Sequence, residues 1–243
     1  MITDRRPNII GGKRKQFIAG AALAFIIYVS FTVLLTWPLV TGLNRYYFSP
    51  EVPGDGAGAV ADNWYSDYAR QHKIEGPVTR LYAYPFGYDT RGAPGYPLDS
   101  GLRNQLTRLF GAQAAFNLLI FFSFPLAGIS MFFLLFYVTG RGTASFLGGF
   151  LYAFAPWHTA RAFDQVSLTG THTLPLFALA LIFFWKRRDY WSAACLAAAS
   201  VVAVYTDFHF GLFCALLAGA WVVAALLVQA RRRGGSPRHA PAV

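Results

Sequence analysis

The sequence has few charged residues and few cysteines, and both shortages narrow the classes of protein that it can encode. Charged residues make up 13% of the 243, whereas hydrophobic residues make up 55%, with a mean hydropathy of +0.39. Soluble domains carry about twice that charged fraction, so the composition indicates an integral membrane protein. The two cysteines, Cys195 and Cys214, lie inside apolar runs and give neither a disulfide framework nor a metal-binding signature.

Long apolar runs are what the sequence does contain. A hydrocarbon core of about 30 Å needs about 20 apolar residues in a helix. Six runs qualify as candidate spans: 17–40, 112–139, 142–157, 166–185, 190–206 and 208–229. The third and fifth are short enough to be tilted or half-buried. We therefore expect an all-α, polytopic membrane helix bundle of about six transmembrane helices over residues 17–229.

The basic residues predict how these spans are oriented. Six alternating spans place four basic segments on one side: residues 1–16, Arg141, 186–188 and 231–233. The apolar length of the first run exceeds that of a signal core, so we expect an uncleaved anchor. Residues 1–16 and the tail 230–243, which is expected to be disordered, are then both cytoplasmic, and the location is the plasma membrane. Topology and anionic lipid account for most of the net charge of +10, so no nucleic-acid partner is expected.

The same topology places most polar candidates outside. The first outside loop, residues 41–111, contains Asp55, Asp62 and Asp67, and the second contains 158–165. Asp207 and His209 fall in the third outside turn. The inner connections are too short for a nucleotide-binding domain, and no glycine-rich phosphate loop follows a strand pattern. These features disfavour a soluble, nucleotide-linked substrate on the inner side.

The stretch from Gly54 onward predicts an amphipathic helix in the first outside loop. Its apolar residues recur at i, i+3, i+4, i+7, i+8 and i+11: Ala57, Val60, Ala61, Trp64, Tyr65 and Tyr68. Asp55 is a candidate N-cap, and Asp62 follows seven residues later on the polar side. The aromatic residues suit a helix that lies at the level of the lipid headgroups. Residues 81–90 and 92–101 are rich in proline and glycine and predict tight turns.

Several stretches in order resemble the GT-C superfamily of multi-spanning, polyprenyl-phosphate-sugar-dependent glycosyltransferases. They are a span that ends in TWPL, an outside Gly-Asp followed by a Trp-containing helix, YPFG, and the later segments AFNLLIFFSFPLAGISMFFL, FLGGFLYAFAPWHTARAFDQ, THTLPLFALAL and VYTDFHFGLF. The resemblance covers most of residues 30–228. It implies an inverting hexosyl or pentosyl transferase whose donor is presented from the outer leaflet.

The resemblance also implies roles for individual residues. The usual catalytic or metal-associated carboxylate of the first outside loop matches Asp55, and Asp62 is a second candidate. A divalent metal is left open as a cofactor. Independently of the family, a sugar hydroxyl needs a carboxylate that accepts its proton, and a leaving phosphate needs a cation. The candidate substrate-binding residues are Trp64, His158, Arg161, Asp164, His172, Asp207 and His209.

Each of these residues also has a purely structural explanation. Asp55 can act only as a helix cap, Arg161 can extend to the headgroups, and Asp164 can pair with Arg161 across one helical turn. Asp207 and His209 lie between two apolar runs, where an unpaired charge is costly, which favours a paired or functional role.

Three functions remain open at this point. The first is a glycosyltransferase that moves a sugar from a polyprenyl phosphate to a cell-envelope acceptor. The second is a non-catalytic membrane subunit or a truncated relative, because members of the family usually have more than six spans; a partner subunit would then complete the bundle. The third is a transporter of lipid-linked saccharides, which the lack of an internal repeat disfavours.

Overall fold

The computed structural model describes residues 12–46, 55–74, 76, 78–81, 83–89 and 97–234. The elements follow one another as α1 (Gly12–Leu35), η1 (Leu39–Thr41), α2 (Asp55–Gln71), β1 (Val78–Thr79), β2 (Tyr88–Asp89), α3 (Pro97–Phe110), α4 (Ala112–Thr139), α5 (Gly142–Ala153), α6 (Pro156–Asp164), η3 (Val166–Thr169), α7 (Thr173–Arg187), α8 (Tyr190–Thr206) and α9 (Phe208–Gly234). The two strands form one short antiparallel hairpin. The expected all-α class is confirmed.

The number of spans differs from the expectation of six. Within the described residues, three helices are long and apolar enough to cross a membrane: Phe17–Leu35, Ala112–Thr139 and Phe208–Arg231. The apolar helix α8 has 17 residues, and α5 and α7 have 12 and 15. Residues 142–157 do not form one continuous helix, because α5 ends at Ala153 and Pro156 begins α6. Proline lacks the N–H that a continuing helix needs and holds the preceding residue in an extended conformation.

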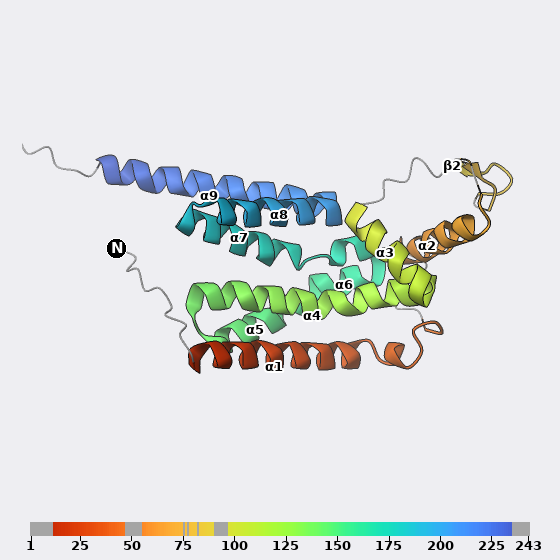
Figure 1. Cartoon of the computed structure of the whole chain (residues 1–243), viewed down its shortest axis with the longest axis horizontal. Helices are drawn as coiled ribbons and strands as arrows, with labels where there is room; N and C mark the ends of the chain where they lie inside the picture. The colour runs from red at the N-terminus through yellow and green to blue at the C-terminus, as the bar shows by residue number, and fades with distance from the viewer. Residues whose placement is uncertain are drawn as a thin grey trace, which may run out of the picture.

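The helices form two groups that meet along α4. A core cluster with Tyr28 and Phe132 joins α1, α4 and α5, and another with Phe177 and Phe210 joins α7, α8 and α9. The two groups lie side by side with their helices roughly along the long axis of the molecule (Figure 1). Half of the apolar window of α4 is buried, compared with 17% for α1 and 6% for α9. Thus α4 is the central helix, and α1 and α9 form opposite outer faces.

Glycines allow the first group to pack closely. The Tyr28 hydroxyl donates a hydrogen bond of 2.8 Å to the Phe146 carbonyl, which links α1 to α5. A Cβ on Gly128 of α4 would lie 2.7 Å from the Tyr28 ring, and one on Gly149 of α5 would lie 2.4 Å from its hydroxyl. Small residues that let helix backbones approach are typical of packing inside membranes.

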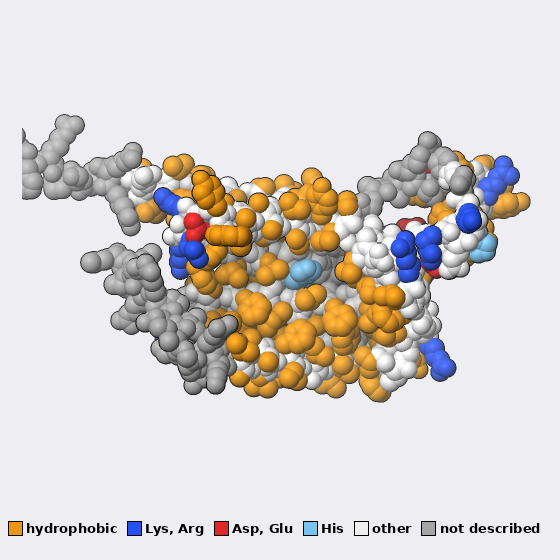
Figure 2. All heavy atoms as spheres, in the orientation of Figure 1, with side chains coloured by type: hydrophobic (Ala, Val, Ile, Leu, Met, Phe, Trp, Pro, Cys, Tyr) orange, Lys and Arg blue, Asp and Glu red, His pale blue; other side chains and the backbone are white. Residues whose placement is uncertain are grey.

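Hydrophobic side chains cover the middle of the molecular surface, and lysine and arginine side chains gather toward its two ends (Figure 2). One end carries α2, α3 and the hairpin, whereas the described beginning of α1 and end of α9 lie at the other (Figure 1). This distribution is typical of a protein whose middle lies in lipid. The end with α2 and α3 is called the loop end below, and the other is called the basic end.

The loop end has more regular structure than the sequence predicted. The helix expected from Ala57 is present as α2, and its Ala59 and Val60 pack against a buried cluster that includes Phe116 of α4 and Ala162 of α6. The turn expected over 81–90 is present at Ala83–Gly87, between the two strands of the hairpin. Of the second expected turn, 92–96 lie outside the described residues, and 97–101 instead begin α3. The resulting layer covers this end of α4 and α6.

The helix α3 has its polar side toward the protein and its apolar side outward. Asp99, Arg103 and Thr107 lie one turn apart on the covered side, where Thr107 is 4% exposed. The leucines of the other side, Leu98, Leu102 and Leu109, are 45%, 50% and 73% exposed. An outward apolar face at the end of a membrane bundle is typical of a helix in the headgroup region. The interfacial helix expected in this loop is therefore better matched by α3 than by α2.

Candidate functional site

The break between α5 and α6 brings His158 into the interior. Pro156 begins α6, so His158 lies in its first turn, and only 1% of it is exposed. Its Nε2 lies 3.1 Å from the Ser123 hydroxyl of α4, and its ring stacks on Phe124 at 4.5 Å. The Ser123 hydroxyl itself donates to the Ile120 carbonyl. The Ala153 backbone carbonyl also interacts with the His158 ring, so α4 and the end of α5 both hold this imidazole.

A cavity of about 340 Å³ lies beside His158. Side chains from the α5–α6 break, the start of α7 and the start of α9 line it: Tyr152, Ala155, Trp157, His158, Thr171, Leu174, Phe210 and Phe213. The Tyr152 hydroxyl donates 2.8 Å to the Thr171 carbonyl and fixes this wall. An apolar, largely aromatic wall with few polar groups is typical of a site for a hydrophobic ligand.

Asp207 forms the turn between α8 and α9, next to this cavity. It is 1% exposed and accepts two hydrogen bonds of 2.8 Å, from the backbone N–H and from the ring Nδ1 of His209. Phe210, which follows His209, lines the cavity. The paired role expected for Asp207 and His209 is therefore present, and the backbone bond shows that Asp207 caps the start of α9.

The structure adds two charged residues of α3 to this turn. Asp99 and Arg103 form an ion pair whose side chains are 14% and 15% exposed. Burial raises the pKa of Asp99; the charge and hydrogen bond of Arg103 act in the opposite direction, and the Asp207 carboxylate adds to the rise. Helix α3 and the turn before α9 therefore interact electrostatically. The sequence feature that could have predicted this ion pair is the i, i+4 spacing of opposite charges in 97–110.

Three candidates lie on α2, which contacts α3, α4 and α6. Helix α2 begins at Asp55, but the Asp55 side chain lies outside the part that the structure describes. Asp62 is exposed, as the polar side of the predicted helix requires. Trp64 is 46% exposed and stacks on Tyr68 at 5.1 Å, so one face of the indole is already covered.

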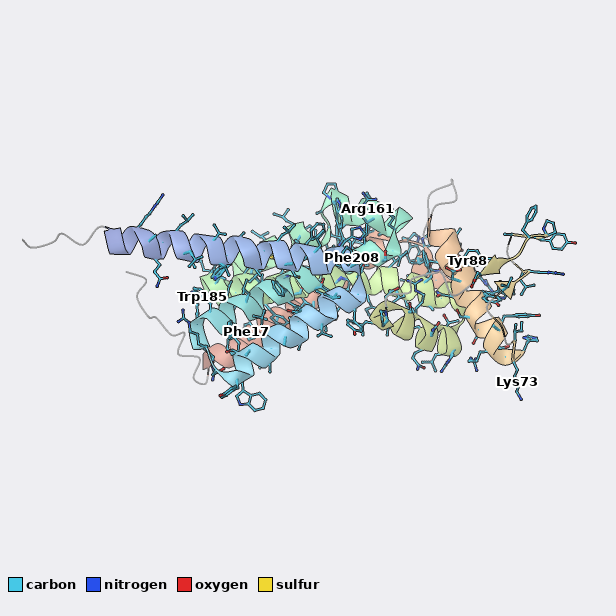
Figure 3. The ribbon with its side chains drawn as sticks, turned by 90° about the horizontal axis from the view of Figure 1, so that it is seen from above. Phe17, Lys73, Tyr88, Arg161, Trp185 and Phe208 are labelled. Atoms are coloured by element: carbon cyan, nitrogen blue, oxygen red, sulfur yellow. The ribbon has the colours of Figure 1, made fainter. Side chains whose placement is uncertain are left out.

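The remaining candidates lie near the cavity or beside it. The Arg161 guanidinium donates 2.6 Å to the Gln165 side chain and lies 5.9 Å from the Trp157 ring centre. Asp164 ends α6, and its side chain is outside the described part, so its expected pairing with Arg161 stays a prediction. His172 precedes α7, interacts electrostatically with His158, and has no described partner for its Nδ1. Figure 3 places Arg161 and Phe208 at the same level along the long axis, between the two ends.

Metal-binding residues do not gather in threes among the described side chains. Asp207 and His209 form a pair of residue types that can bind metal, and their side chains are in contact.

Comparison with protein-family models, curated proteins and solved structures gives no match for this chain.

Proposed function

We propose that the protein is a membrane glycosyltransferase that moves a sugar from a polyprenyl-phosphate donor to a cell-envelope acceptor on the outer face of the plasma membrane. The observation that carries this proposal is the cavity beside His158. Its wall is apolar and includes His158 and Phe210, and the Phe210 N–H donates to the carbonyl of Asp207. A donor with a long hydrocarbon tail and a charged head needs an apolar wall for the tail and polar groups for the head.

The tail and the head place different demands on the site. The aromatic side chains Trp157, Phe210 and Phe213 offer contact area to an isoprenoid chain. The phosphate requires a cation, and Arg161 bonds to the neutral amide of Gln165, with no described carboxylate at ion-pair distance. Arg161, on the same α6 as His158, is our proposed cation for an anionic head.

Transfer itself needs a base for the acceptor hydroxyl. A hydroxyl is a poor nucleophile at neutral pH, and a carboxylate that takes its proton in the transition state speeds the attack. Asp55, at the start of α2, is our proposed base, and Asp62 is the second candidate on the same helix. Trp64 follows Asp62 on this helix and stacks on Tyr68. We propose that the exposed edge of its indole contacts the sugar.

The outer location rests on the basic residues of the short loops. Arg141, the segment 186–188 and Arg231 adjoin the basic end, whereas the loop end belongs to a loop of about seventy residues, too long to determine orientation. We expect a Lys73→Cys variant to react with a membrane-impermeant maleimide added outside intact cells. An Arg188→Cys variant should react only after the cells are opened, and the reverse pattern would contradict the orientation.

The donor site can be tested by filling the cavity. Ala155 lines it, so Ala155→Phe should raise the KM for a polyprenyl-phosphate sugar about tenfold or more, since a lost apolar contact of about 1.4 kcal/mol has that effect. Leu151→Phe is the matched control, because Leu151 lies four residues before Ala155, on α5, and is 71% exposed. Equal kinetics in the two variants, with both folded, would place the donor elsewhere.

A second function has one observation in its favour. The apolar windows of α1 and α9 are only 17% and 6% buried, which leaves two large faces for lipid or for another subunit. A non-catalytic subunit would use these faces to complete a larger bundle. Purification in mild detergent distinguishes the two: a stoichiometric second protein, together with no transfer by this chain alone, would favour the subunit.

A further inference from the structure

The basic end carries a residue in an unfavourable backbone conformation. Arg188 ends α7 with φ 53° and ψ 38°, the left-handed region in which glycine usually stands at this position. Arginine at such a position suggests a use for its side chain. Cations near a helix C-terminus also complement the helix dipole, but Lys186 and Arg187 already do so in the last turn.

The Arg188 side chain continues a row of aromatic residues that leads to α9. Its guanidinium lies 5.1 Å from the centre of the Trp185 ring, and Trp185 meets Trp221 of α9 edge to face at 6.2 Å. Neighbouring Arg187 is paired with Asp189 at 2.7 Å. Among the described residues, Arg188 has no carboxylate within ion-pair distance, so its charge is unmatched.

The last turns of α9 extend beyond the ends of α7 and α8 (Figure 1). Trp221 lies beside Trp185, and the next charge on α9 is Arg231, ten residues or about 15 Å farther along the axis. Residues 222–228 are all apolar, Gln229 is uncharged, and Val223, Leu226 and Leu227 are each more than half exposed. An unmatched cation therefore lies at a level where the neighbouring helix is still apolar.

We propose that Arg188, Trp185 and Trp221 hold the headgroup of an anionic phospholipid, whose acyl chains extend from Trp221 toward the middle of the molecule along exposed apolar residues of α9 such as Leu212 and Leu216. The unmatched guanidinium meets the phosphodiester, and the two indoles suit the border between headgroups and hydrocarbon. Charge complementarity favours a lipid over a protein helix at this place, because a helix would supply no phosphate for Arg188. This inference does not depend on glycosyl transfer. Figure 3 shows Trp185 far from Lys73, which provides the control.

Arg188→Gly tests the proposal because it removes the charge and also relieves the backbone. Lys73→Gly is the matched control: Lys73 is an exposed cation with φ 49° at the loop end. The full chain is placed in nanodiscs of phosphatidylcholine alone or with phosphatidylglycerol, and the Tm is measured. Wild type and Lys73→Gly should gain roughly 3 °C from phosphatidylglycerol, the shift expected for one cation at an anionic surface.

Arg188→Gly should lose most of that gain while its Tm in pure phosphatidylcholine stays equal or rises. A gain in Arg188→Gly equal to that of Lys73→Gly would overturn the proposal. So would an equal stabilisation of the wild type by inorganic phosphate in pure phosphatidylcholine, since the ligand would then be free phosphate. A Tm of the wild type that is the same in both lipids would also contradict it.

Discussion

At the scale of single residues, buried Asp207 shows which contacts of the site the sequence could predict and which it could not. The position of Asp207 between two apolar runs predicted a partner, and the structure supplies the backbone and ring of His209. The partners from α3 could not be predicted, because the contact joins segments about one hundred residues apart and depends on which side of α3 faces inward. Hydrophobic periodicity gives the two sides of a helix, but it does not give the neighbour of each side.

The Asp99–Arg103 pair gives a prediction at this scale. Arg103→Gln leaves Asp99 buried near Asp207 without its cation, which should lower the free energy of unfolding by about 3 kcal/mol at neutral pH. A buried carboxyl whose pKa is raised on folding stabilises the fold below its unfolded pKa and loses this contribution as pH rises through the folded pKa. The loss should therefore be smaller at about pH 5 than at about pH 8.

Thermal unfolding of Arg103→Gln in a fixed detergent across this pH range measures the effect. Arg70→Gln is its control, because Arg70 pairs with Asp67 on the exposed side of α2 and should cost no more than about 1 kcal/mol. Adding Asp99→Asn to Arg103→Gln should restore most of the stability. Equal, pH-independent losses in the two single variants would show that the α3 pair is not effectively buried.

Individual helices were predicted well where their apolar pattern was long, and poorly where proline intervened. The sequence predicted α2, α4, α8 and α9 close to their observed bounds, because long apolar or periodic runs specify helices. It predicted turns where α3 begins, since Pro97 was read as a breaker although proline is favoured in the first turn of a helix. It also predicted one continuous run over 142–157, which Pro156 divides.

Helix packing gives a prediction at the scale of elements. Gly149→Ala places a methyl group 2.4 Å from the Tyr28 hydroxyl and 2.6 Å from the Gly128 carbonyl, so α1, α4 and α5 must separate. Overpacking of this kind costs about 1–3 kcal/mol, which should lower the Tm by roughly 2–12 °C. Gly20→Ala on α1, where nothing lies within 4 Å, should leave it unchanged. A matching Tm in the two variants would mean that these helices are not closely packed.

At the scale of the whole molecule, composition predicted a membrane bundle, and the arrangement of the described helices agrees with it. The middle is apolar and the charges gather at both ends (Figure 2). What composition could not predict is that the runs between α4 and α9 form shorter helices, and that the breaks and turns beside them carry His158, His172 and Asp207. Such breaks are tolerated at membrane depth where other parts of the protein cover the freed backbone groups. They are the reason that polar candidates adjoin an apolar cavity.

Sugar transfer by purified protein in lipid is the decisive measurement for the proposed function. A panel of radiolabelled polyprenyl-phosphate sugars would be supplied with membrane-extract acceptors to wild type, Asp55→Asn and Asp67→Asn. Asp67 lies on the same α2 and pairs with Arg70, so its variant controls for a lost carboxylate on this helix. We expect transfer by wild type and by Asp67→Asn, and a loss of about a hundredfold or more in Asp55→Asn. Equal transfer by both variants, or no transfer by folded wild type from any donor, would contradict the proposal.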